Sequence, residues 1–475
     1  IGTGDSGTGG SFSVSGAGTV VWATSISDQT SKANGTWQGM VYEGSKGCVY
    51  GNVQLDWNFT NPANNILSVP AGGTLVIPAG VTFTNQGTMS IMGALNNAGA
   101  LENTGIVYQA GTYTGAAATG GGVWVELKEA RYLDMEGTAK THMALPALAN
   151  GFDWGMETEE MWYVAEGDVT VHGRITVTGN VHLILANGAT FTVNGGIEVG
   201  EGNSFTVYAQ STEESEMGSL EAKAATDSDE AGIGGGQFGT GGEMTIIGGK
   251  VTATGAEYSA GIGGGLLGSG GKVTVYGGVV NATGGSTEGN MSGAGIGGGT
   301  GTVAVYGGTV TATGGTAAES AYYGGAGIGT GGLQESDIIE LTVTLAGGQV
   351  TATGGAGTVA CGAGIGIGGG NYGDVRFTLT ISDGVVVATG GAGAEEGGAG
   401  TEKGGAGIGT GGENRAGSVN FTATLSGGQV TATGGTGTEA GGAGIGAGGT
   451  STRCDISIAA TLSGGQVTAT GGAGT

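Results

Sequence analysis

The feature that most constrains this sequence is a pair of short phrases, each of which occurs seven times. One phrase is Val-Thr-Ala-Thr-Gly or a close variant, and it starts at residues 251, 280, 310, 350, 386, 430 and 467. The other is Ala-Gly-Ile-Gly, and its Ile is residue 233, 262, 296, 328, 365, 408 and 445. Copies lie 29 to 44 residues apart, because the segments between the phrases vary in length. Constant phrases with variable connections predict stacked repeats that pack on their neighbours and tolerate inserted loops.

A third piece, such as residues 273–276, precedes each Val-Thr-Ala-Thr phrase, so each repeat carries three strand-like segments with glycine corners. Side chains alternate between the two faces of a strand, so Val and Ala of the phrase face one side and Thr the other. The position before one corner is apolar in every copy: Ile246, Val275, Val305, Leu345, Ile381, Leu425 and Leu462. A constantly apolar row beside a variable row predicts an all-β fold, a right-handed parallel β-helix, for residues 166–475.

Glycine accounts for 116 of the 475 residues, and two glycine-rich classes of protein can be excluded. Collagen requires glycine at every third position with abundant proline, and this chain has 4 prolines. Disorder requires low hydrophobicity, whereas 38% of these residues are hydrophobic. Along the chain we expect an N-terminal cap or small β domain (residues 1–60), looser β-helical rungs (61–123), a non-repetitive insertion or junction (124–165) and the glycine-rich β-helix (166–475).

The formal net charge is −26, from 39 acidic and 13 basic residues. This charge excludes nucleic acid as a partner and argues against docking on anionic lipid. No apolar run is long enough to span a bilayer, so no membrane insertion of this segment is expected. The three cysteines, Cys48, Cys361 and Cys454, match no metal motif and are odd in number, so we expect small buried residues instead of a disulfide framework.

Two resemblances bear on function. The stretch Trp162-Tyr163-Val164, the strands that follow it and the Gly-Ala-Gly-Ile-Gly-Gly-Gly repeats resemble adhesin-like, glycine-rich β-helical surface proteins of Gram-positive gut bacteria, over about residues 130–475. The resemblance implies a secreted protein at the bacterial cell surface. More distantly, the repeats are similar to the clostridial carbohydrate-binding β-helix family, whose phrase is Gly-Asp-Gly-Ile.

The distant family is associated with polysaccharide and with calcium, but the aspartate of its phrase is absent here. Alanine replaces it in every copy: Ala231, Ala260, Ala294, Ala326, Ala363, Ala406 and Ala443. Because calcium prefers carboxylate oxygens, no ligand motif supports calcium. We expect no cofactor and no metal-ligand residues, with calcium as the alternative that stays open.

Aromatic residues supply the candidate carbohydrate-binding sites. Tyr276 and Tyr306 take the same outward position in adjacent repeats, where strand spacing would place their rings about 5 Å apart. Such rings can stack on sugars, or they can simply stabilise the sheet. Trp154, Trp162 and Tyr163 form a second candidate, for which core packing is the alternative.

An enzyme needs a different set of residues. A polysaccharide hydrolase needs paired carboxylates and a lyase needs a strong base, whereas the repeat strands hold almost no acids. Arg376 is an isolated base on a strand, and His142, His172 and His182 share no repeat position. We therefore expect no enzymatic activity.

The expected function is a structural stalk or adhesin-like module that presents a site for a carbohydrate or a host receptor. The alternative is a dedicated polysaccharide-binding module, and a polysaccharide lyase or hydrolase ranks third. The sequence stops after Val-Thr-Ala-Thr-Gly-Gly, where Ala-Gly-Ile-Gly is due, so we expect a fragment of a longer chain. An uncapped sheet edge would also favour end-to-end or lateral self-association.

Overall fold

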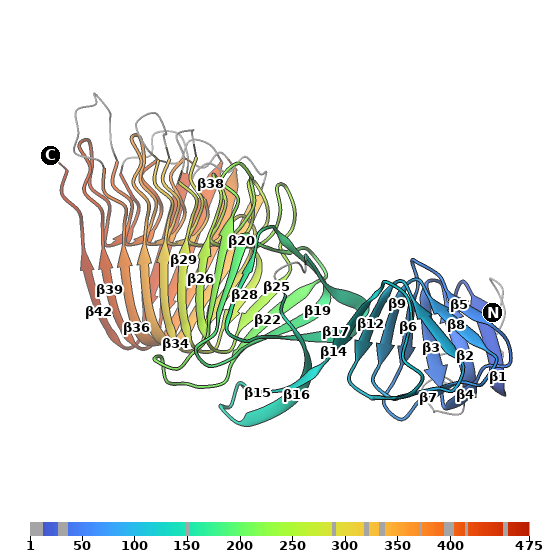
Figure 1. Ribbon diagram of the computed structural model, residues 1–475. Coiled ribbons are helices and arrows are strands. Elements are labelled where there is room, and N and C mark those ends of the chain that lie inside the picture. Colours follow the sequence, from blue (N-terminus) through green and yellow to red (C-terminus); the bar gives the residue numbers. More distant parts are fainter. Residues whose placement is uncertain are drawn as a thin grey trace. The chain divides into compact units, whose positions relative to one another are not determined.

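Figure 1 shows the computed structural model. It describes residues 13–26, 37–148, 152–286, 291–317, 323–331, 338–370, 373–393, 403–413, 417–449 and 455–474. All elements within these ranges are β-strands, and almost all of their pairings are parallel, which confirms the predicted all-β class. In the described part of the chain, no helix has the length and apolar character needed to cross a membrane.

The chain divides into two compact units. Unit 1 comprises residues 1–129 with 143–145, and unit 2 comprises residues 130–142 with 146–475. The division therefore falls inside residues 124–165, the segment predicted as an insertion or junction. Each unit has its own β-sheets.

Unit 1 contains three sheets, and from β4 to β12 every third strand returns to the same sheet. The first sheet holds β1 (Ser15–Ala23), β2 (Gln38–Glu43), β3 (Lys46–Tyr50), β6 (Ile66–Val69), β9 (Thr88–Ile91), β12 (Ile106–Gln109) and β14 (Val123–Glu126). The second holds β13 (Thr112–Gly115), β10 (Ala94–Asn97), β7 (Thr74–Ile77) and β4 (Asn52–Gln54). The third holds β11 (Ala100–Asn103), β8 (Thr82–Asn85) and β5 (Phe59–Asn61). Among these pairs, β2 and β3 are antiparallel.

One apolar core runs through unit 1 from Met40 to Val107. Residues 40–59 contribute Met40, Tyr42 and Phe59 to this core. The alternating burial of each strand explains the core, because every second side chain points inward.

Asparagines line one buried edge of the core. Asn61 pairs with Asn85, and Asn85 pairs with Asn103, in adjacent strands. The Asn61 Nδ2 donates to Asn85 Oδ1 at 2.8 Å, and the Asn85 Nδ2 donates to Asn103 Oδ1 at 2.8 Å. This asparagine ladder extends to the Tyr42 hydroxyl, which donates to Asn61 Oδ1 at 3.0 Å. The sequence patterns considered above do not predict this ladder.

Unit 2 begins with β15 (Lys128–Leu133), β16 (Ala139–Pro146) and β17 (Asp153–Ala165), after which the chain builds three rows of parallel strands. Row A contains the second part of β19 (Ile175–Leu185), β22 (Ser204–Ala209), β25 (Glu243–Ile246), β28 (Gly271–Val275), β31 (Gly301–Val305), the first parts of β34 (Ile338–Thr353) and β36 (Asp374–Thr389), β38 (Ser418–Leu425) and β41 (Asp455–Leu462).

Row B contains β18 (Asp168–Val171), β20 (Thr190–Gly195), β23 (Ser219–Ala224), β26 (Lys250–Thr254), β29 (Val279–Thr283), β32 (Thr309–Thr313), the second parts of β34 and β36, β39 (Gln429–Thr433) and β42 (Gln466–Thr470). Row C contains the first part of β19, β21 (Ile197–Val199), β24 (Ile233–Gly234), β27 (Ile262–Gly263), β30 (Ile296–Gly297), β33 (Ile328–Gly329), β35 (Ile365–Gly366), β37 (Ile408–Gly409) and β40 (Ile445–Gly446).

The strand register confirms the alignment of the repeats. Along row A, Ile246 pairs with Val275, and the pairing continues in the same positions to Leu462. Along row B, Ala253 pairs with Ala282, and alanine occupies this position through Ala469. These apolar residues are buried up to β39, whereas Leu462, in the last described repeat, is 54% exposed.

Row C extends beyond the seven copies of the Ala-Gly-Ile-Gly phrase. Ile233 pairs with Ile197, and Ile197 pairs with Ile175, although neither earlier isoleucine lies in the phrase. The row of buried isoleucines in row C therefore begins two strands before the first copy of the phrase. Figure 1 shows strands of row B, such as β26, β29, β39 and β42, as parallel arrows whose colours pass from green to red.

Candidate functional site

Tyr276 and Tyr306 follow the row A strands β28 and β31, and both side chains are partly exposed, at 38% and 48%. The ring centroids lie 5.2 Å apart and the ring planes differ by 14°. The predicted spacing of about 5 Å is confirmed. Nearly parallel rings at this distance form an offset stack, so each ring covers part of the other's face.

Because the two rings are stacked, they present their edges sideways and do not make one continuous flat surface. The face of Tyr306 that points away from Tyr276 lies toward the next repeat, where Ala346 follows Leu345 in the row. Alanine is too small to cover a phenol ring. The 48% exposure of Tyr306 and its small neighbour make the Tyr306 ring the candidate contact surface for a sugar at this site.

On the other side of Tyr276, the same position is held by Ile247 and then by Tyr208, because Val207 pairs with Ile246 and Ile246 with Val275. Tyr208 is 8% exposed and packs against other aromatic rings. At this outward-facing position of row A, the side chain is therefore buried in Tyr208 and exposed in Tyr306.

Trp154, Trp162 and Tyr163 are buried, so the second carbohydrate-site prediction was wrong for all three. Trp154 stacks on Tyr163 with centroids 4.1 Å apart and on Phe191 at 5.4 Å. The Tyr163 hydroxyl accepts a hydrogen bond from the Gly155 amide at 3.1 Å. Both rings serve core packing, the alternative to a sugar site.

Trp162 points to the opposite face of β17 from its neighbour Tyr163, and this face is covered as well. Its ring lies between His142, at 4.4 Å, and His182, at 4.3 Å. Tyr132 of β15 contacts both Trp162 and Tyr208. Aromatic side chains of the β15–β16 hairpin thus bury a position that alternation alone would leave exposed.

His182 is held at both ring nitrogens within this aromatic cluster. Its Nε2 lies 2.7 Å from Glu160 Oε1, and its Nδ1 lies 3.1 Å from the Tyr208 hydroxyl. Burial lowers the pKa of His182; the Glu160 carboxylate opposes this effect, and His142 adds to it. Burial also raises the pKa of Tyr208. Sequence reasoning missed the cluster because its members share no repeat position.

We expect the free energy of unfolding to fall between about pH 7 and about pH 5, in part because of His182. Its folded-state pKa is below its unfolded value of about 6.5, so the unfolded chain takes up the proton first as the pH falls. A His182→Gln variant should show a shallower fall than the wild type. Denaturation by urea at several pH values measures the difference, and identical slopes in both proteins would refute it.

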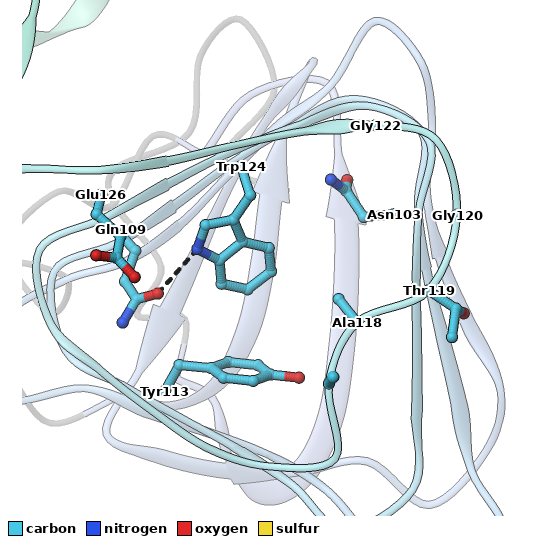
Figure 2. A pocket seen from close by; sticks show the side chains of 10 residues that line it. Asn103, Gln109, Tyr113, Ala118, Thr119, Gly120, Gly122, Trp124 and Glu126 are labelled. Carbon is cyan, nitrogen blue, oxygen red and sulfur yellow. Dashed lines mark hydrogen bonds between the residues drawn. The ribbon is translucent and has the colours of Figure 1, made fainter.

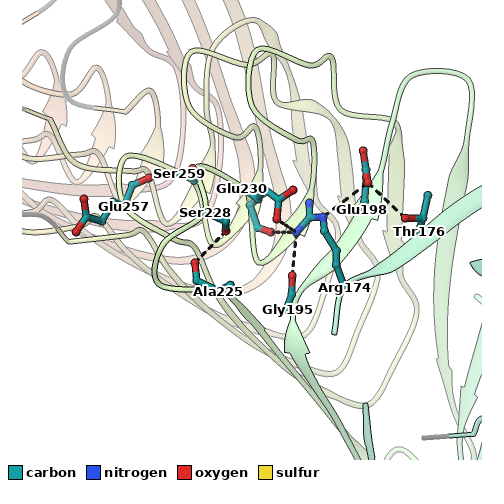
Figure 3. Close-up of polar contacts among 10 residues, drawn as sticks. Arg174, Thr176, Gly195, Glu198, Ala225, Ser228, Glu230, Glu257 and Ser259 are labelled. Atoms are coloured by element: carbon teal, nitrogen blue, oxygen red, sulfur yellow. Dashed lines mark hydrogen bonds and ion pairs between the residues drawn. The ribbon is translucent and has the colours of Figure 1, made fainter. Parts of the chain in front are cut away.

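Arg174 lies beside two carboxylates, as Figure 3 shows. Its Nη1 is 3.3 Å from Glu230 Oε2, and its Nε is 3.8 Å from Glu198 Oε2. The same Nη1 also donates to the carbonyl oxygens of Gly195, at 3.1 Å, and Ala231, at 3.2 Å. Burial lowers the pKa of Arg174, and both carboxylates oppose this. Since the guanidinium is directed at main-chain oxygens, its position fits a structural cap at the start of row C.

Arg376 and His172, which were also considered for catalysis, do not lie in a common site. Arg376 is not isolated, because it forms an exposed ion pair with Glu340 on the adjacent strand. His172 is exposed. Within the described residues, no group of three or more His, Cys, Asp or Glu is placed to hold a metal ion.

Cysteine positions follow the expectation in part. Cys361 is buried, Cys48 is half-buried, and neither is in a disulfide. Cys454 lies outside the described residues.

A pocket of about 330 Å³ lies in unit 1 and was not predicted (Figure 2). Its aromatic walls are Tyr113 of β13 and Trp124 of β14, whose centroids lie 5.0 Å apart at an interplanar angle of 74°. Figure 2 shows the indole of Trp124 above the ring of Tyr113, with Ala118 across the opening. Both strands are edge strands of their sheets, so no further strand covers these rings within the described part of unit 1.

Comparison of the chain with known protein families, curated proteins and solved structures finds no match.

Proposed function

We propose that unit 2 is a right-handed parallel β-helix and that the chain is a stalk-like, adhesin-type module of a secreted bacterial surface protein. In this proposal, unit 2 presents a carbohydrate-binding site on the open face of Tyr306. The ligand is an extended polysaccharide or host glycan that lies along row A.

The return of the chain to the same row after every third strand supports a β-helix. Crossover connections between parallel strands are right-handed in nearly all proteins, which supports the handedness. Row C has nine strands at a spacing of about 4.8 Å, so the array extends for about 40 Å. Such an array is a rigid spacer, because each repeat is hydrogen-bonded to its neighbours.

The single observation that carries the carbohydrate proposal is the open face of Tyr306. Tyr306 is 48% exposed, is fixed from behind by Tyr276, and faces Ala346 in the next repeat. A sugar ring has an apolar face of C–H groups that can pack on an aromatic face, and a ring held by a stacked neighbour loses little conformational freedom on binding.

Polar residues lie beyond Ala346, where the register shifts so that Ala346 pairs with Asp383. Ser382, Ser426 and Ser463 follow the buried row A residues Ile381 and Leu425 and the more exposed Leu462, which pair with one another in turn. Ser382 is exposed in the repeat after Ala346, and its hydroxyl can donate to or accept from sugar hydroxyls. The surface beside Tyr306 therefore offers space and hydroxyl groups to a glycan chain.

We expect a glycan array to identify a carbohydrate that binds wild-type protein, and Tyr306→Ala to weaken its binding at least about tenfold. Tyr306→Phe should retain most of the affinity, since the aromatic face remains. Tyr276→Ala should weaken binding less, because it removes the support behind the ring. Val387→Ala, an exposed apolar change in row B, is the matched control and should have no effect.

Titration calorimetry with the glycan identified measures these affinities. Equal binding by wild type and Tyr306→Ala, or no glycan bound by the wild type, would refute the carbohydrate site. A dedicated polysaccharide-binding module would show binding to one polysaccharide and to no host glycan. Cleavage of a uronide polymer that is lost on changing a single carboxylate would instead establish the third candidate, a lyase or hydrolase.

A further inference from the structure

The pocket between Tyr113 and Trp124 has polar lining groups that are already engaged with one another. The Trp124 Nε1 donates to Gln109 Oε1 at 2.9 Å, so the single N–H of the indole is used. The Gln109 Nε2 donates to the Gly111 carbonyl oxygen at 3.1 Å. The Tyr113 hydroxyl donates to the Ala116 carbonyl oxygen and accepts from Asn97 Nδ2 at 3.1 Å.

Asn103, at the end of the asparagine ladder, is engaged at both ends of its amide. Its Oδ1 accepts from Asn85, and its Nδ2 donates to the Val123 carbonyl oxygen at 3.1 Å. A ligand rich in hydroxyl groups needs several donors and acceptors that are not already paired. This lining offers mainly aromatic faces and the methyl groups of Ala117 and Ala118.

Glu126 is the one lining residue with a formal charge. It is exposed, and its carboxylate forms no ion pair with any residue in the described part of the chain. It lies two residues after Trp124 on β14, and Figure 2 shows it beside Gln109 at the indole N–H side of the pocket. Among the described residues, no basic side chain neutralises this negative charge at the pocket.

We propose that this pocket binds an alkylated ammonium group. Aromatic faces attract a cation through their quadrupole, and the effect is strongest for tryptophan. Quaternary ammonium ions suit such a site best, because they are weakly hydrated and have no N–H group that would need a hydrogen-bond acceptor. Glu126 supplies the opposite charge at the rim and disfavours anionic ligands. This site is independent of the Tyr306 face, which lies in unit 2.

The aromatic lining also has a structural role, which the test must separate from binding. Tyr113, Ala118 and Trp124 pack against the unit 1 core, so their side chains cover its last turn. A purely structural cap would tolerate other large apolar side chains and would show no preference for charge. The ammonium site requires both the aromatic faces and the carboxylate.

The probes are choline and 3,3-dimethylbutan-1-ol, which has the same shape without the charge. We expect titration calorimetry on the full chain to detect choline binding and to find the neutral alcohol at least about tenfold weaker. Glu126→Gln should weaken choline binding by a similar factor without affecting the fold, because this side chain is exposed. Trp124→Leu should abolish binding while still covering the core.

Asp56→Asn is the matched control, because it removes a carboxylate at another exposed position of unit 1 outside the pocket lining, and it should leave choline binding unchanged. Thermal unfolding of each variant shows whether unit 1 remains folded. The proposal is overturned if choline does not bind, if the neutral alcohol binds equally well, or if Glu126→Gln binds choline as the wild type does. Binding of a neutral sugar at this pocket in place of choline would overturn it too.

Discussion

Replacing Gly366 by alanine is expected to remove more than about 4 kcal/mol from the free energy of unfolding of unit 2. Gly366 has φ of +143°, and a Cβ atom there would lie 1.8 Å from the carbonyl oxygen of Gly409 in the next repeat. The obstacle is backbone, which cannot rotate away as a flexible side chain would. Relief requires that row C separate at this step, where the Gly409 carbonyl oxygen accepts from the Ile367 amide at 3.0 Å.

Gly202→Ala separates the two causes of this loss. Gly202 also has positive φ, at +80°, but no atom outside its immediate neighbours lies within 4 Å of the added Cβ. It should therefore show only the cost of a left-handed backbone, about 1–2 kcal/mol. Denaturation by guanidinium chloride, followed by circular dichroism, measures both variants. Similar losses for the two would show that close approach of the rows is not what requires glycine.

The second large effect is expected for Asn85→Ala in unit 1, which should lose about 3–5 kcal/mol. The Asn85 Nδ2 donates to Asn103 Oδ1 and to the carbonyl oxygens of Gly87 and Ile106, both at 3.1 Å. Its Oδ1 accepts from Asn61 at 2.8 Å. Alanine would remove the donor to the buried Asn103 Oδ1 and one of the acceptors of the Asn61 amide.

Asn64→Ala is the matched control for the ladder, since Asn64 is exposed in the same unit and should change stability by less than about 0.5 kcal/mol. Asn85→Asp adds a second comparison, because it keeps the shape and removes the two amide hydrogens. We expect it to be destabilising as well. A loss for Asn85→Ala as small as that for Asn64→Ala would show that the ladder contributes no net stability. Chemical denaturation of the full chain supplies the measurement.

The inward and outward positions of the repeats could be predicted because the same residue types recur at the same place in each copy along the sequence. Ile246, Val275 and Val305 are apolar in every copy, and strand alternation then assigns their row to the interior. The same alignment placed Tyr276 next to Tyr306, and the rings stack as expected. It could not predict how much of each ring is exposed, which is 38% for Tyr276 and 48% for Tyr306.

The errors fall where the repeat stops. Trp162 and Tyr163 lie on opposite faces of β17, and both are buried because the β15–β16 hairpin contributes Tyr132 and His142 from outside the repeats. The Tyr113–Trp124 pocket depends on two edge strands of different sheets and on a loop, residues 116–122, that has no repeated counterpart. A tryptophan two residues after a run of three glycines was the signal available in the sequence.

Within the seven repeats, the spacing of apolar residues and glycines was enough to predict three strand-like segments per repeat and the inward face of each row. The exposure of each aromatic ring and the hydrogen-bond partners of each buried polar side chain could not be predicted in this way. Those properties depend on contacts between segments far apart in sequence: Arg174 reaches the carbonyl of Ala231, and Asn103 is engaged by Asn85 before it can meet a ligand. The exposure of a side chain and the number of its unpaired hydrogen-bonding groups depend on tertiary packing, and these two properties determine where this chain can bind a ligand.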